Sequence, residues 1–287
     1  MTSPRTLLHT QNIRAKKTLG QHFLTDPKTA ERIVLLSEIG TGDTVLEIGS
    51  GLGALTVPAA GRAGRLIAVE TDRRLIDLLK AEISSHGFTN VTIVEENILK
   101  LDILKFADAA GEKLVVLGNL PYNISSSILV RLVGVRKGIS RAVLMLQKEV
   151  ADRITALPGK KTRGRLSVLI QYCARVRGLL DVSSSLFFPR PGVDSRVVEI
   201  VFYEETPLEP EAERQFFKIV QAAFGKRRKT LKNALSQGGL GLNAEMAGQI
   251  LDRAGIDPKR RAETIELYEF INIYNAIEAK NPDAHDG

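Results

Sequence analysis

The chain has 287 residues, of which 44% are apolar, and 40 basic against 33 acidic residues give a net charge of +7. This apolar content is enough for a buried core and argues against a disordered chain. A single cysteine, Cys173, excludes a framework of internal disulfides, and the lack of a signal-like or membrane-length apolar run predicts a soluble, cytoplasmic protein.

From residue 26 to about residue 205, short apolar runs alternate with amphipathic stretches. Asp26 and Pro27 are typical of a helix start, and Asp72 is expected to cap a further helix that ends near His86. Strands alternating with helices predict an α/β fold with a mainly parallel sheet. The last two strands have no convincing helix between them, which favours an antiparallel hairpin at the sheet edge. The predicted strands are 44–48, 65–69, 91–94, 113–117, 142–146, 176–182 and 197–203.

Residues 204–210 are rich in proline and acidic side chains, which is typical of a linker. Beyond them the apolar periodicity is helical throughout. We therefore expect two domains, residues 1–205 and a small helical domain at 206–287. The predicted helices of the second domain are 211–224, 229–236, 244–254 and 262–279.

A glycine loop follows the first predicted strand, in the order Glu47-Ile48-Gly49-Ser50-Gly51-Leu52-Gly53. Glycines let the backbone turn tightly and let a ligand approach it closely. Glu70 ends the next strand, where a carboxylate can accept hydrogen bonds from both ribose hydroxyls of a nucleoside. A dinucleotide site stays open, since Ala54 completes a G-x-G-x-x-A pattern, and so does a plain strand–helix turn. The E-x-G-x-G-x-G form resembles the S-adenosylmethionine loop of class I methyltransferases.

The tetrapeptide Asn119-Leu120-Pro121-Tyr122 directly follows the strand 113–117, so we expect it to face the same crevice as the glycine loop. The side-chain oxygen of Asn119 and the carbonyl of Leu120 could accept the two N–H bonds of an adenine amine. That would favour a pyramidal, nucleophilic nitrogen. Pro121 would stiffen the turn, and Tyr122 could stack on the base. The alternative is a purely structural turn.

Positive charge is concentrated in three windows that contain no acidic residue, at 1–25, 153–180 and 214–244. They hold 18 basic residues, which leaves 22 basic against 33 acidic residues in the rest of the chain. Such segregation is what a surface that binds nucleic-acid phosphates needs. The alternative is a set of solvated loops and helix faces. The residues that we expect to contact RNA are Arg163, Arg165, Lys226, Arg227, Arg228, Lys229 and Lys232.

These motifs together resemble the small-subunit ribosomal RNA adenine dimethyltransferases, the KsgA/RsmA family, over nearly the whole chain. The erythromycin-resistance rRNA methyltransferases are close cousins, but the two C-terminal motifs favour the first family. The segments that carry the resemblance are 16–24 (KKTLGQHFL), 47–53, 119–122, the F-x-P-x-P-x-V-x-S run at 187–195, 227–235 (RRKTLKNAL) and 261–264 (RAET).

The resemblance implies a class I methyltransferase fold, with a Rossmann-like sheet in a catalytic domain (1–205) and an all-helical RNA-binding domain (206–287). It also implies S-adenosylmethionine as the cofactor. The cofactor-binding residues expected from the loop and the resemblance are Gln21, His22, Leu24, Gly49, Gly51, Glu70, Asn97 and Asn119. The expected catalytic residues are Asn119, Leu120, Pro121, Tyr122 and Phe187.

Two of these positions carry an open question. The family usually has Gly-Asp-Ala-Leu where this chain has Glu96-Asn97-Ile98-Leu99. Asn97 could still accept a hydrogen bond from the adenine amine of the cofactor through its amide oxygen, without the charge that makes such bonds roughly twice as strong. Phe187 is expected either near the target base or in the core.

The resemblance implies dimethylation of the 6-amino groups of two adjacent adenosines near the 3′ end of 16S rRNA, during biogenesis of the small ribosomal subunit. The expected partner is 16S rRNA or the immature small subunit, and the expected state is a monomer without a metal or a membrane. The alternatives are a methyltransferase of large-subunit rRNA, a DNA adenine methyltransferase, and a ribosome-assembly factor without turnover.

Overall fold

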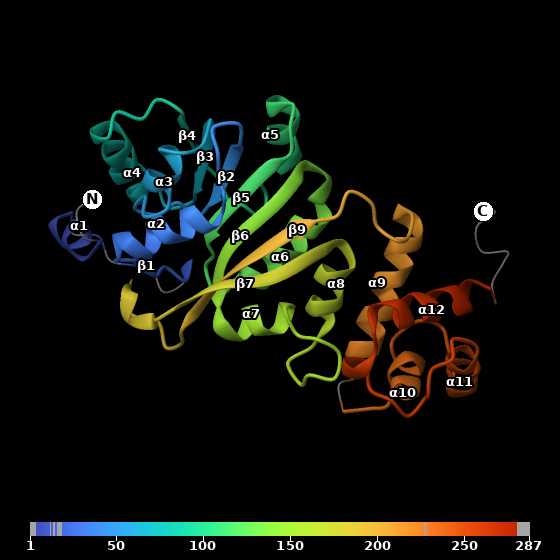
Figure 1. The fold of residues 1–287 in the computed structure, drawn as a ribbon. Coiled ribbons are helices and arrows are strands. Elements are labelled where there is room, and N and C mark those ends of the chain that lie inside the picture. Colours follow the sequence, from blue (N-terminus) through green and yellow to red (C-terminus); the bar gives the residue numbers. More distant parts are fainter. Residues whose placement is uncertain (1–3, 12, 14, 16–18, 227, 280–287) are drawn as a thin grey trace. The chain divides into compact units, whose positions relative to one another are not determined.

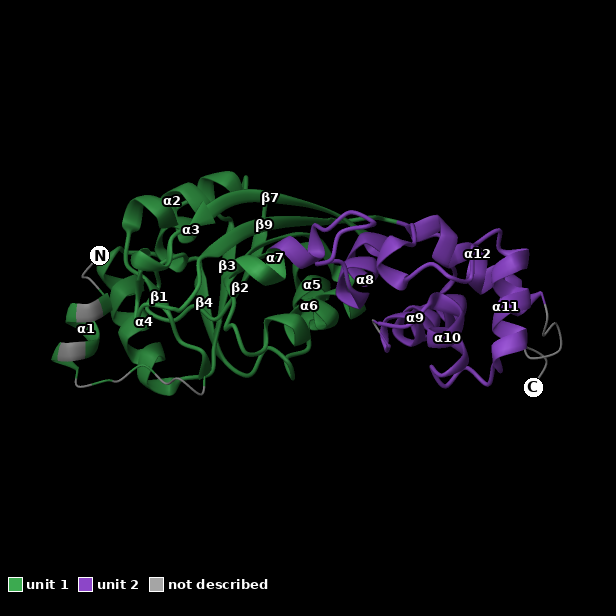
Figure 2. Ribbon diagram, turned by 90° about the horizontal axis from the view of Figure 1, so that it is seen from below, with its two compact units in different colours: residues 1–151, 174–204 green, residues 152–173, 205–287 purple. Residues whose placement is uncertain are grey.

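The computed structural model describes residues 4–11, 13, 15, 19–226 and 228–279. The chain divides into two compact units, one of residues 1–151 and 174–204 and one of residues 152–173 and 205–287 (Figure 2). The second unit thus includes residues 152–173, which the sequence placed in the first domain. No helix in the described part of the chain combines the length and the apolar character that a membrane span requires.

A seven-stranded sheet forms the centre of the first unit, in the order β4-β3-β2-β5-β6-β9-β7 (Figure 1). The pairs from β4 to β6 are parallel, whereas β9 is antiparallel to both β6 and β7. The mostly parallel α/β fold is therefore confirmed, including the antiparallel pair at the sheet edge. The strands are β2 (Thr44–Ile48), β3 (Arg65–Glu70), β4 (Val91–Glu95), β5 (Leu114–Asn119), β6 (Ile139–Gln147), β7 (Ala174–Val182) and β9 (Ser195–Phe202).

Apolar side chains of the central strands pack against the flanking helices. Val45 and Leu117 belong to one buried cluster with Ile33 and Leu79, so that two neighbouring strands are fixed by two different helices. A strand buried on both faces reads as a continuous apolar run, as residues 114–117 of β5 do. The helices of this unit are α1 (Pro4–Thr10), α2 (Pro27–Leu36), α3 (Thr56–Ala60), α4 (Arg73–Ser85), α5 (Ile103–Ala110), α6 (Ser125–Gly134), η2 (Arg136–Gly138) and η3 (Ser184–Leu186), and α7 (Lys148–Ile154) continues into the second unit.

The two expected helix starts behave differently. Asp26 caps α2, since its carboxylate accepts a hydrogen bond from the Thr29 amide at 2.9 Å. Asp72 occupies the N-cap position of α4, but its side chain does not cap the helix. Its carboxylate instead accepts hydrogen bonds from Gln21 Nε2 (3.1 Å) and from the Arg74 guanidinium (2.7 and 3.0 Å). The acidic residue therefore ties the N-terminal segment to α4.

A second, two-stranded sheet pairs β1 (Phe23–Leu24) with β8 (Phe187–Phe188), which the sequence did not predict. Phe187 lies opposite Leu24 in this antiparallel pair and is 4% exposed. Both side chains belong to the main core cluster. Of the two positions expected for Phe187, the structure gives the one in the core.

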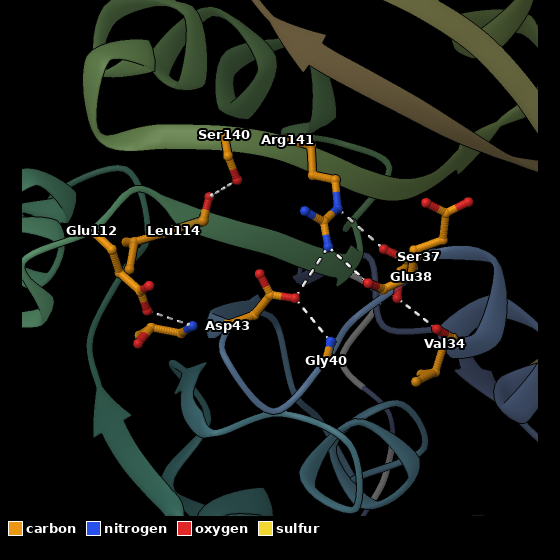
Figure 3. A network of polar contacts seen from close by, with 10 residues as sticks. Val34, Ser37, Glu38, Gly40, Asp43, Glu112, Leu114, Ser140 and Arg141 are labelled. Atoms are coloured by element: carbon orange, nitrogen blue, oxygen red, sulfur yellow. Dashed lines mark hydrogen bonds and ion pairs between the residues drawn. The ribbon is translucent and has the colours of Figure 1, made fainter.

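A polar network ties the amino-terminal ends of the central strands together (Figure 3). Arg141 of β6 donates hydrogen bonds to the carbonyls of Ser37 (3.2 Å) and Glu38 (3.0 Å), which follow α2, and to Asp43 Oδ2 (3.2 Å). Asp43 Oδ2 also accepts a hydrogen bond from the Gly40 amide at 2.9 Å. One guanidinium thus holds the loop between α2 and β2. This loop lies at the amino-terminal ends of the strands, away from their carboxyl ends.

The second unit is helical and is built from two separate stretches of chain. Tyr172 of α8 packs on Phe216 of α9, with ring centroids 4.8 Å apart, and its hydroxyl accepts a hydrogen bond from the Leu208 amide. The expected helix at 262–279 is divided, because Glu266 and Glu269 form a capping box that starts a new helix. The helices are α8 (Arg165–Cys173), α9 (Pro210–Phe224), α10 (Leu231–Ser236), α11 (Ala244–Arg253), η4 (Ala262–Thr264) and α12 (Leu267–Glu278).

Candidate active site

A cavity of about 330 Å³ opens at the carboxyl ends of β2, β3 and β5, in the first unit. Open α/β sheets bind their ligands at this edge, because the loops after parallel strands converge there. The segment before β1 and the segment after β4 complete the wall. The cavity brings together every expected site residue of the first unit except Phe187, namely Gln21, His22, Leu24, Gly49, Gly51, Glu70, Asn97, Asn119, Leu120, Pro121 and Tyr122.

The glycine loop is held against the end of β3. The amides of Gly49 and Ser50 both donate to the Val69 carbonyl, at 2.9 and 3.2 Å. Gly49 has φ +71° and Gly51 has φ +54°, which residues with a side chain rarely adopt. A Cβ on Gly51 would also lie 3.4 Å from the Phe23 ring. The loop therefore needs glycine for its conformation, and it presents bare backbone to the cavity.

Glu70 fastens the glycine loop to the turn before α4. Its Oε2 accepts a hydrogen bond from the Gly51 amide (2.9 Å), and its Oε1 accepts from the amides of Thr71 (2.8 Å) and Asp72 (2.9 Å). The Thr71 hydroxyl also lies 3.5 Å from Oε1, whereas among the described residues Oε2 accepts only from Gly51 and therefore keeps an acceptor position for a ligand hydroxyl. Glu70 thus has a structural role beside the expected ribose contact.

The orientation of the Asn119 amide follows from its partner. Its Nδ2 donates to the His22 carbonyl at 2.9 Å. A carbonyl can only accept, so the amide nitrogen must face His22 and the amide oxygen must point the other way. In the described residues Oδ1 has no hydrogen-bond partner. Asn119 lines the cavity, so this residue brings an acceptor of fixed direction to the site.

Tyr122 is held from two sides. Its hydroxyl shares a hydrogen bond of 2.7 Å with Ser195 Oγ, and its ring stacks on the His22 ring with centroids 5.2 Å apart. Burial raises the pKa of Tyr122, so its phenol stays neutral. His22 Nδ1 lies 2.7 Å from the Pro189 carbonyl, which places a proton on Nδ1. These contacts fix the aromatic ring beside Asn119.

Asn97 uses its amide oxygen within its own turn. Oδ1 accepts a hydrogen bond from the Leu99 amide at 2.9 Å, while Glu96 Oε1 accepts from the Asn97 amide at 2.6 Å. The oxygen that we expected to receive the adenine amine of the cofactor is thus already engaged, although it keeps a second lone pair. The Nδ2 donor is the other polar group of Asn97 at this end of the cavity.

The residues expected to contact RNA separate into two groups. Arg163 is 1% exposed and donates hydrogen bonds to the Ala156 carbonyl (2.9 Å) and Gln171 Oε1 (2.7 Å), so its burial rules out a surface contact. The side chains of Arg165, Lys226, Arg228 and Lys229 are exposed, and that of Lys232 is half-buried. Arg227 lies outside the described residues.

Three residues at the site were not among the site residues expected from the sequence. Ser195 holds Tyr122, and Gly20 packs so closely that a Cβ there would lie 2.8 Å from Asn123 Oδ1. Glu47 lines the cavity as a buried carboxylate. All three belong to segments that carried the family resemblance, which is the signal that could have pointed to them. In the described part of the chain no cluster of three histidine, cysteine or acidic side chains could hold a metal.

Comparison with known proteins gives a consistent picture. A family model described as "Ribosomal RNA adenine dimethylase" matches residues 12–275. The "Ribosomal RNA small subunit methyltransferase A" of Desulforapulum autotrophicum is 49% identical over 277 residues, which cover 96% of this chain and 97% of that protein. The protein of the same name from Pelotomaculum thermopropionicum is 42% identical over 281 residues and covers 95% of both chains.

Two crystal structures share the fold. A dimethyladenosine transferase from Plasmodium falciparum superposes with a TM-score of 0.77 at 25% identity, and covers 90% of this chain and 98% of its own. The 23S rRNA methyltransferase ErmE gives a TM-score of 0.69 at 26% identity, and covers 89% of this chain and 99% of its own. Both alignments extend over nearly all of the chain.

Proposed function

Because this chain belongs to the ribosomal RNA adenine dimethylase family, we propose that it is an enzyme that dimethylates adenines of small-subunit rRNA with S-adenosylmethionine. The targets in this proposal are the N6 amines of two adjacent adenosines near the 3′ end of 16S rRNA. Each amine receives two methyl groups during biogenesis of the small subunit. The observation that carries the proposal is the fixed amide oxygen of Asn119, a residue that lines the same cavity as the glycine loop and Glu70.

The cavity fits S-adenosylmethionine. The bare backbone of the loop at Gly49 admits a ligand at close range, and Glu70 keeps acceptor capacity for ribose hydroxyls. Buried polar atoms without a partner, Glu47 Oε2 and Ser50 Oγ, belong to residues that line the same cavity, as expected where a polar ligand completes the site. When bound, S-adenosylmethionine supplies a methyl group activated by its sulfonium.

Asn119 prepares the nucleophile. The lone pair of the adenine amine is delocalised into the ring, so the nitrogen is a poor nucleophile until it becomes pyramidal. Asn119 Oδ1 accepts one of its N–H bonds, and the Leu120 carbonyl accepts the other. The hydrogen bond from Asn119 Nδ2 to His22 fixes the direction of that acceptor before the substrate arrives. Methylation makes the amine cationic, and the methylated cation is a strong acid. It therefore loses its proton readily, and no general base is required.

Tyr122 positions the base. Its ring stacks on His22 and its hydroxyl is tied to Ser195, so the exposed part of the ring offers a fixed surface for stacking. Aromatic side chains hold bases that have been extruded from RNA or DNA in this way. Pro121 stiffens the turn between the acceptor and the aromatic ring.

Basic residues of the second unit bind the substrate in this proposal. We infer that Arg165, Lys226, Arg227, Arg228, Lys229 and Lys232 neutralise phosphates of the rRNA or of the immature small subunit. The enzyme acts as a monomer in the cytoplasm, where the subunit is assembled.

Mass spectrometry of nucleosides tests the function. Small subunits from a strain that lacks this activity are incubated with the protein and labelled S-adenosylmethionine, and the digested rRNA should contain labelled N6,N6-dimethyladenosine. Primer extension should then place two adjacent modified adenosines near the 3′ end of 16S rRNA. Transfer to DNA, or binding to the subunit without transfer, would contradict the proposal.

The likeness to ErmE supports one second candidate, a methyltransferase of 23S rRNA. The higher identity to small-subunit methyltransferases argues against it. Large subunits or 23S rRNA in the same assay separate the two, because only the second candidate would label them.

A further inference from the structure

The loop between α7 and α8, residues 155–164, contains two successive turns. The first has the sequence LPGK. Its Lys160 amide donates to the Leu157 carbonyl at 3.2 Å, and Gly159 has φ +84°. Proline at the second position and a glycine of positive φ at the third are typical of a type II turn. The Arg163 amide then donates to the Lys160 carbonyl at 3.0 Å, which forms the second turn. The loop therefore has a defined shape.

Arg163 closes this loop from the inside. Its side chain is buried, and its Nη1 donates to the Ala156 carbonyl (2.9 Å) and to Gln171 Oε1 (2.7 Å). Gln171 Nε2 donates in turn to the carbonyls of Ile154 (3.0 Å) and Ala156 (3.1 Å). One guanidinium and one amide thus join the two ends of the loop to α8. Hydrogen bonds from a charged donor are stronger than neutral ones, and burial keeps water from competing for them.

The fixed loop presents an apolar side chain to solvent. Leu157 is 67% exposed, the largest exposed fraction among the large apolar side chains of the described residues. The turn that carries it is held against η4, because the Gly159 amide donates to the Glu263 carbonyl at 2.8 Å. A single exposed leucine is common on protein surfaces. Leu157 differs because the chain fixes its position before a partner arrives, which lowers the entropy cost of binding.

The charge around the leucine indicates the class of partner. Lys160 and Arg165 of the same segment are exposed, and residues 153–180 contain no acidic side chain. A cationic surface without acids attracts a polyanion, since neutralised phosphates release their counterions. Residues 153–165 also contain no aromatic side chain, on which the bases of single-stranded RNA would stack. The loop therefore fits a double helix better than a single strand.

The shape of the loop favours one kind of double helix. The minor groove of A-form RNA is wide and shallow and displays ribose hydroxyls and base edges, whereas that of B-DNA is about 6 Å wide and about 7.5 Å deep. A short turn can lie in the shallow groove without deforming the helix. Leucine and proline are among the apolar side chains that proteins place in minor grooves.

We propose that the α7–α8 loop docks in the minor groove of an RNA double helix, with Leu157 and Pro158 against the riboses and Lys160 on a phosphate. Arg163 is a positioning residue, which keeps the loop folded before RNA is bound. The inference rests on the proposed function for the source of the helix, the rRNA of the small subunit. It adds an apolar contact that depends on shape to the phosphate contacts of the other basic residues.

Binding of an RNA duplex of about 20 base pairs tests the apolar contact. Leu157→Ser changes no charge, so the full-length variant should bind the duplex about 5- to 20-fold more weakly at every salt concentration. The slope of log K against log salt should stay the same, since no phosphate contact is lost. Lys160→Ala should instead reduce this slope by about 1. Fluorescence anisotropy of a labelled duplex measures both quantities.

Matched variants and probes separate this contact from general effects. Leu35→Ser removes another exposed leucine, on α2 of the first unit, and Lys80→Ala removes an exposed lysine of the same unit. Both should keep the affinity and the salt slope of wild type. Leu157→Ser should leave unchanged the binding of a DNA duplex and of single-stranded RNA with the same sequence.

A double-mutant cycle tests the role of Arg163. Arg163→Met keeps the aliphatic part of the side chain but loses the hydrogen bonds, so the loop should open and duplex affinity should fall about as far as in Leu157→Ser. In the protein that carries both substitutions, the second one should weaken binding little further, because both act on one contact. Arg163→Lys keeps a donor for the Ala156 carbonyl and should restore much of the affinity. Additive losses would contradict the positioning role.

Unchanged affinity of Leu157→Ser for the RNA duplex would overturn the proposal, and so would an equal loss for the RNA duplex, the DNA duplex and the single strand. Binding to phosphatidylserine vesicles that depends on Leu157, with RNA binding unaffected, would assign the loop to a lipid surface instead. Duplex binding that depends on Leu157 in a protein that does not methylate rRNA would count against the proposed function alone.

Discussion

At the scale of single residues, the direction of one amide decides the proposed chemistry. Asn119 offers an oxygen to the substrate because its nitrogen is bound to the His22 carbonyl. Asn119→Ala should lower single-turnover methyl transfer by about 10²–10³-fold or more, while cofactor affinity stays within a few-fold. Rapid-quench transfer of labelled methyl groups and calorimetry measure the two quantities.

Asn119→Asp separates the role of the oxygen from that of the amide. A carboxylate keeps an acceptor but cannot donate to the His22 carbonyl, so the two oxygens would repel each other and the acceptor would turn away. The variant should therefore be nearly as slow as Asn119→Ala. Rates close to wild type would show that the hydrogen bond to His22 has no part in transfer.

The buried carboxyl of Glu47 affects stability. Because of its burial above all, its pKa is higher in the folded protein, at about 7, than its ordinary value of 4.5. Between these two pKa values the carboxyl is protonated in the folded state and ionised in the unfolded state. The free energy of unfolding therefore falls as the pH rises across this window, by roughly 3 kcal/mol for the full pKa shift. Glu47→Gln should remove this loss, so ligand-free Glu47→Gln should gain more in urea midpoint at pH 8 than at pH 5. Equal changes at both pH values would argue against a protonated Glu47.

The sequence identified most of the residues at the site but not how they are held. Glycine spacing and the acid after the next strand predicted the loop and Glu70, because this pattern has few structural alternatives. The hydrogen bonds of Glu70 to three amides, and the use of the Asn97 oxygen by Leu99, depend on local backbone geometry that no spacing reveals. The sequence also left two positions possible for Phe187, because an aromatic residue suits both a core and a site that binds a base.

At the scale of elements, Arg141 connects β6 to the loop after α2 (Figure 3). Two of its acceptors are carbonyls just beyond the C-terminus of that helix, where a cation is favourable. Arg141→Met should keep the aliphatic part of the side chain and lower the free energy of unfolding by about 1–2 kcal/mol. A lower urea midpoint with an unchanged m-value would report this, and cofactor affinity should not change.

Lys137→Met is the matched control for that substitution. Lys137 is exposed and lies two residues before β6, so its loss should change the midpoint very little. If both variants lost the same stability, the effect would come from net charge and not from the network around Arg141.

Elements with a strong apolar pattern were predictable, and short ones were not. β2 is found at 44–48 as expected, because Val45, Leu46 and Ile48 form a short apolar segment directly before the glycine loop. The pair of β1 and β8 has two residues on each side, too few for any periodicity. The division of the last helix depends on the capping box of Glu266 and Glu269, a polar signal inside an apolar repeat.

At the scale of the whole molecule, the proposed RNA contacts depend on charge. The exposed side chains of Lys226, Arg228 and Lys229 lie between α9 and α10. Their joint replacement by alanine should weaken subunit binding and reduce the slope of log K against log salt by about 2–3, for three lost phosphate contacts. Filter binding over a range of salt concentrations measures the slope.

A control for net charge is available in the first unit. Lys80, Lys100 and Lys105 are exposed and do not line the cavity, and their replacement removes the same three charges. This variant should keep the wild-type salt slope. A slope that fell equally in both variants would show that only the total charge of the protein matters.

Amino-acid composition predicted only part of the division into two units. The linker-like stretch at 204–210 predicted the change of unit near residue 205, but nothing in the sequence marks residues 152–173 as part of the helical unit. Their assignment follows from long-range contacts such as those of Tyr172 with Phe216 and Leu208. Arg163 was misjudged for the same reason, since a basic window does not tell which arginine is buried.

The split composition of the second unit affects how the protein can be dissected. A chain cut after residue 204 would keep α8 but lose α9, and Tyr172 and its neighbours would expose their apolar side to water. During synthesis α8 is also made before β9, which completes the sheet, and before α9, against which α8 packs. An isolated catalytic fragment therefore calls for a short bridge that joins residue 151 to residue 174, besides removal of the C-terminal part.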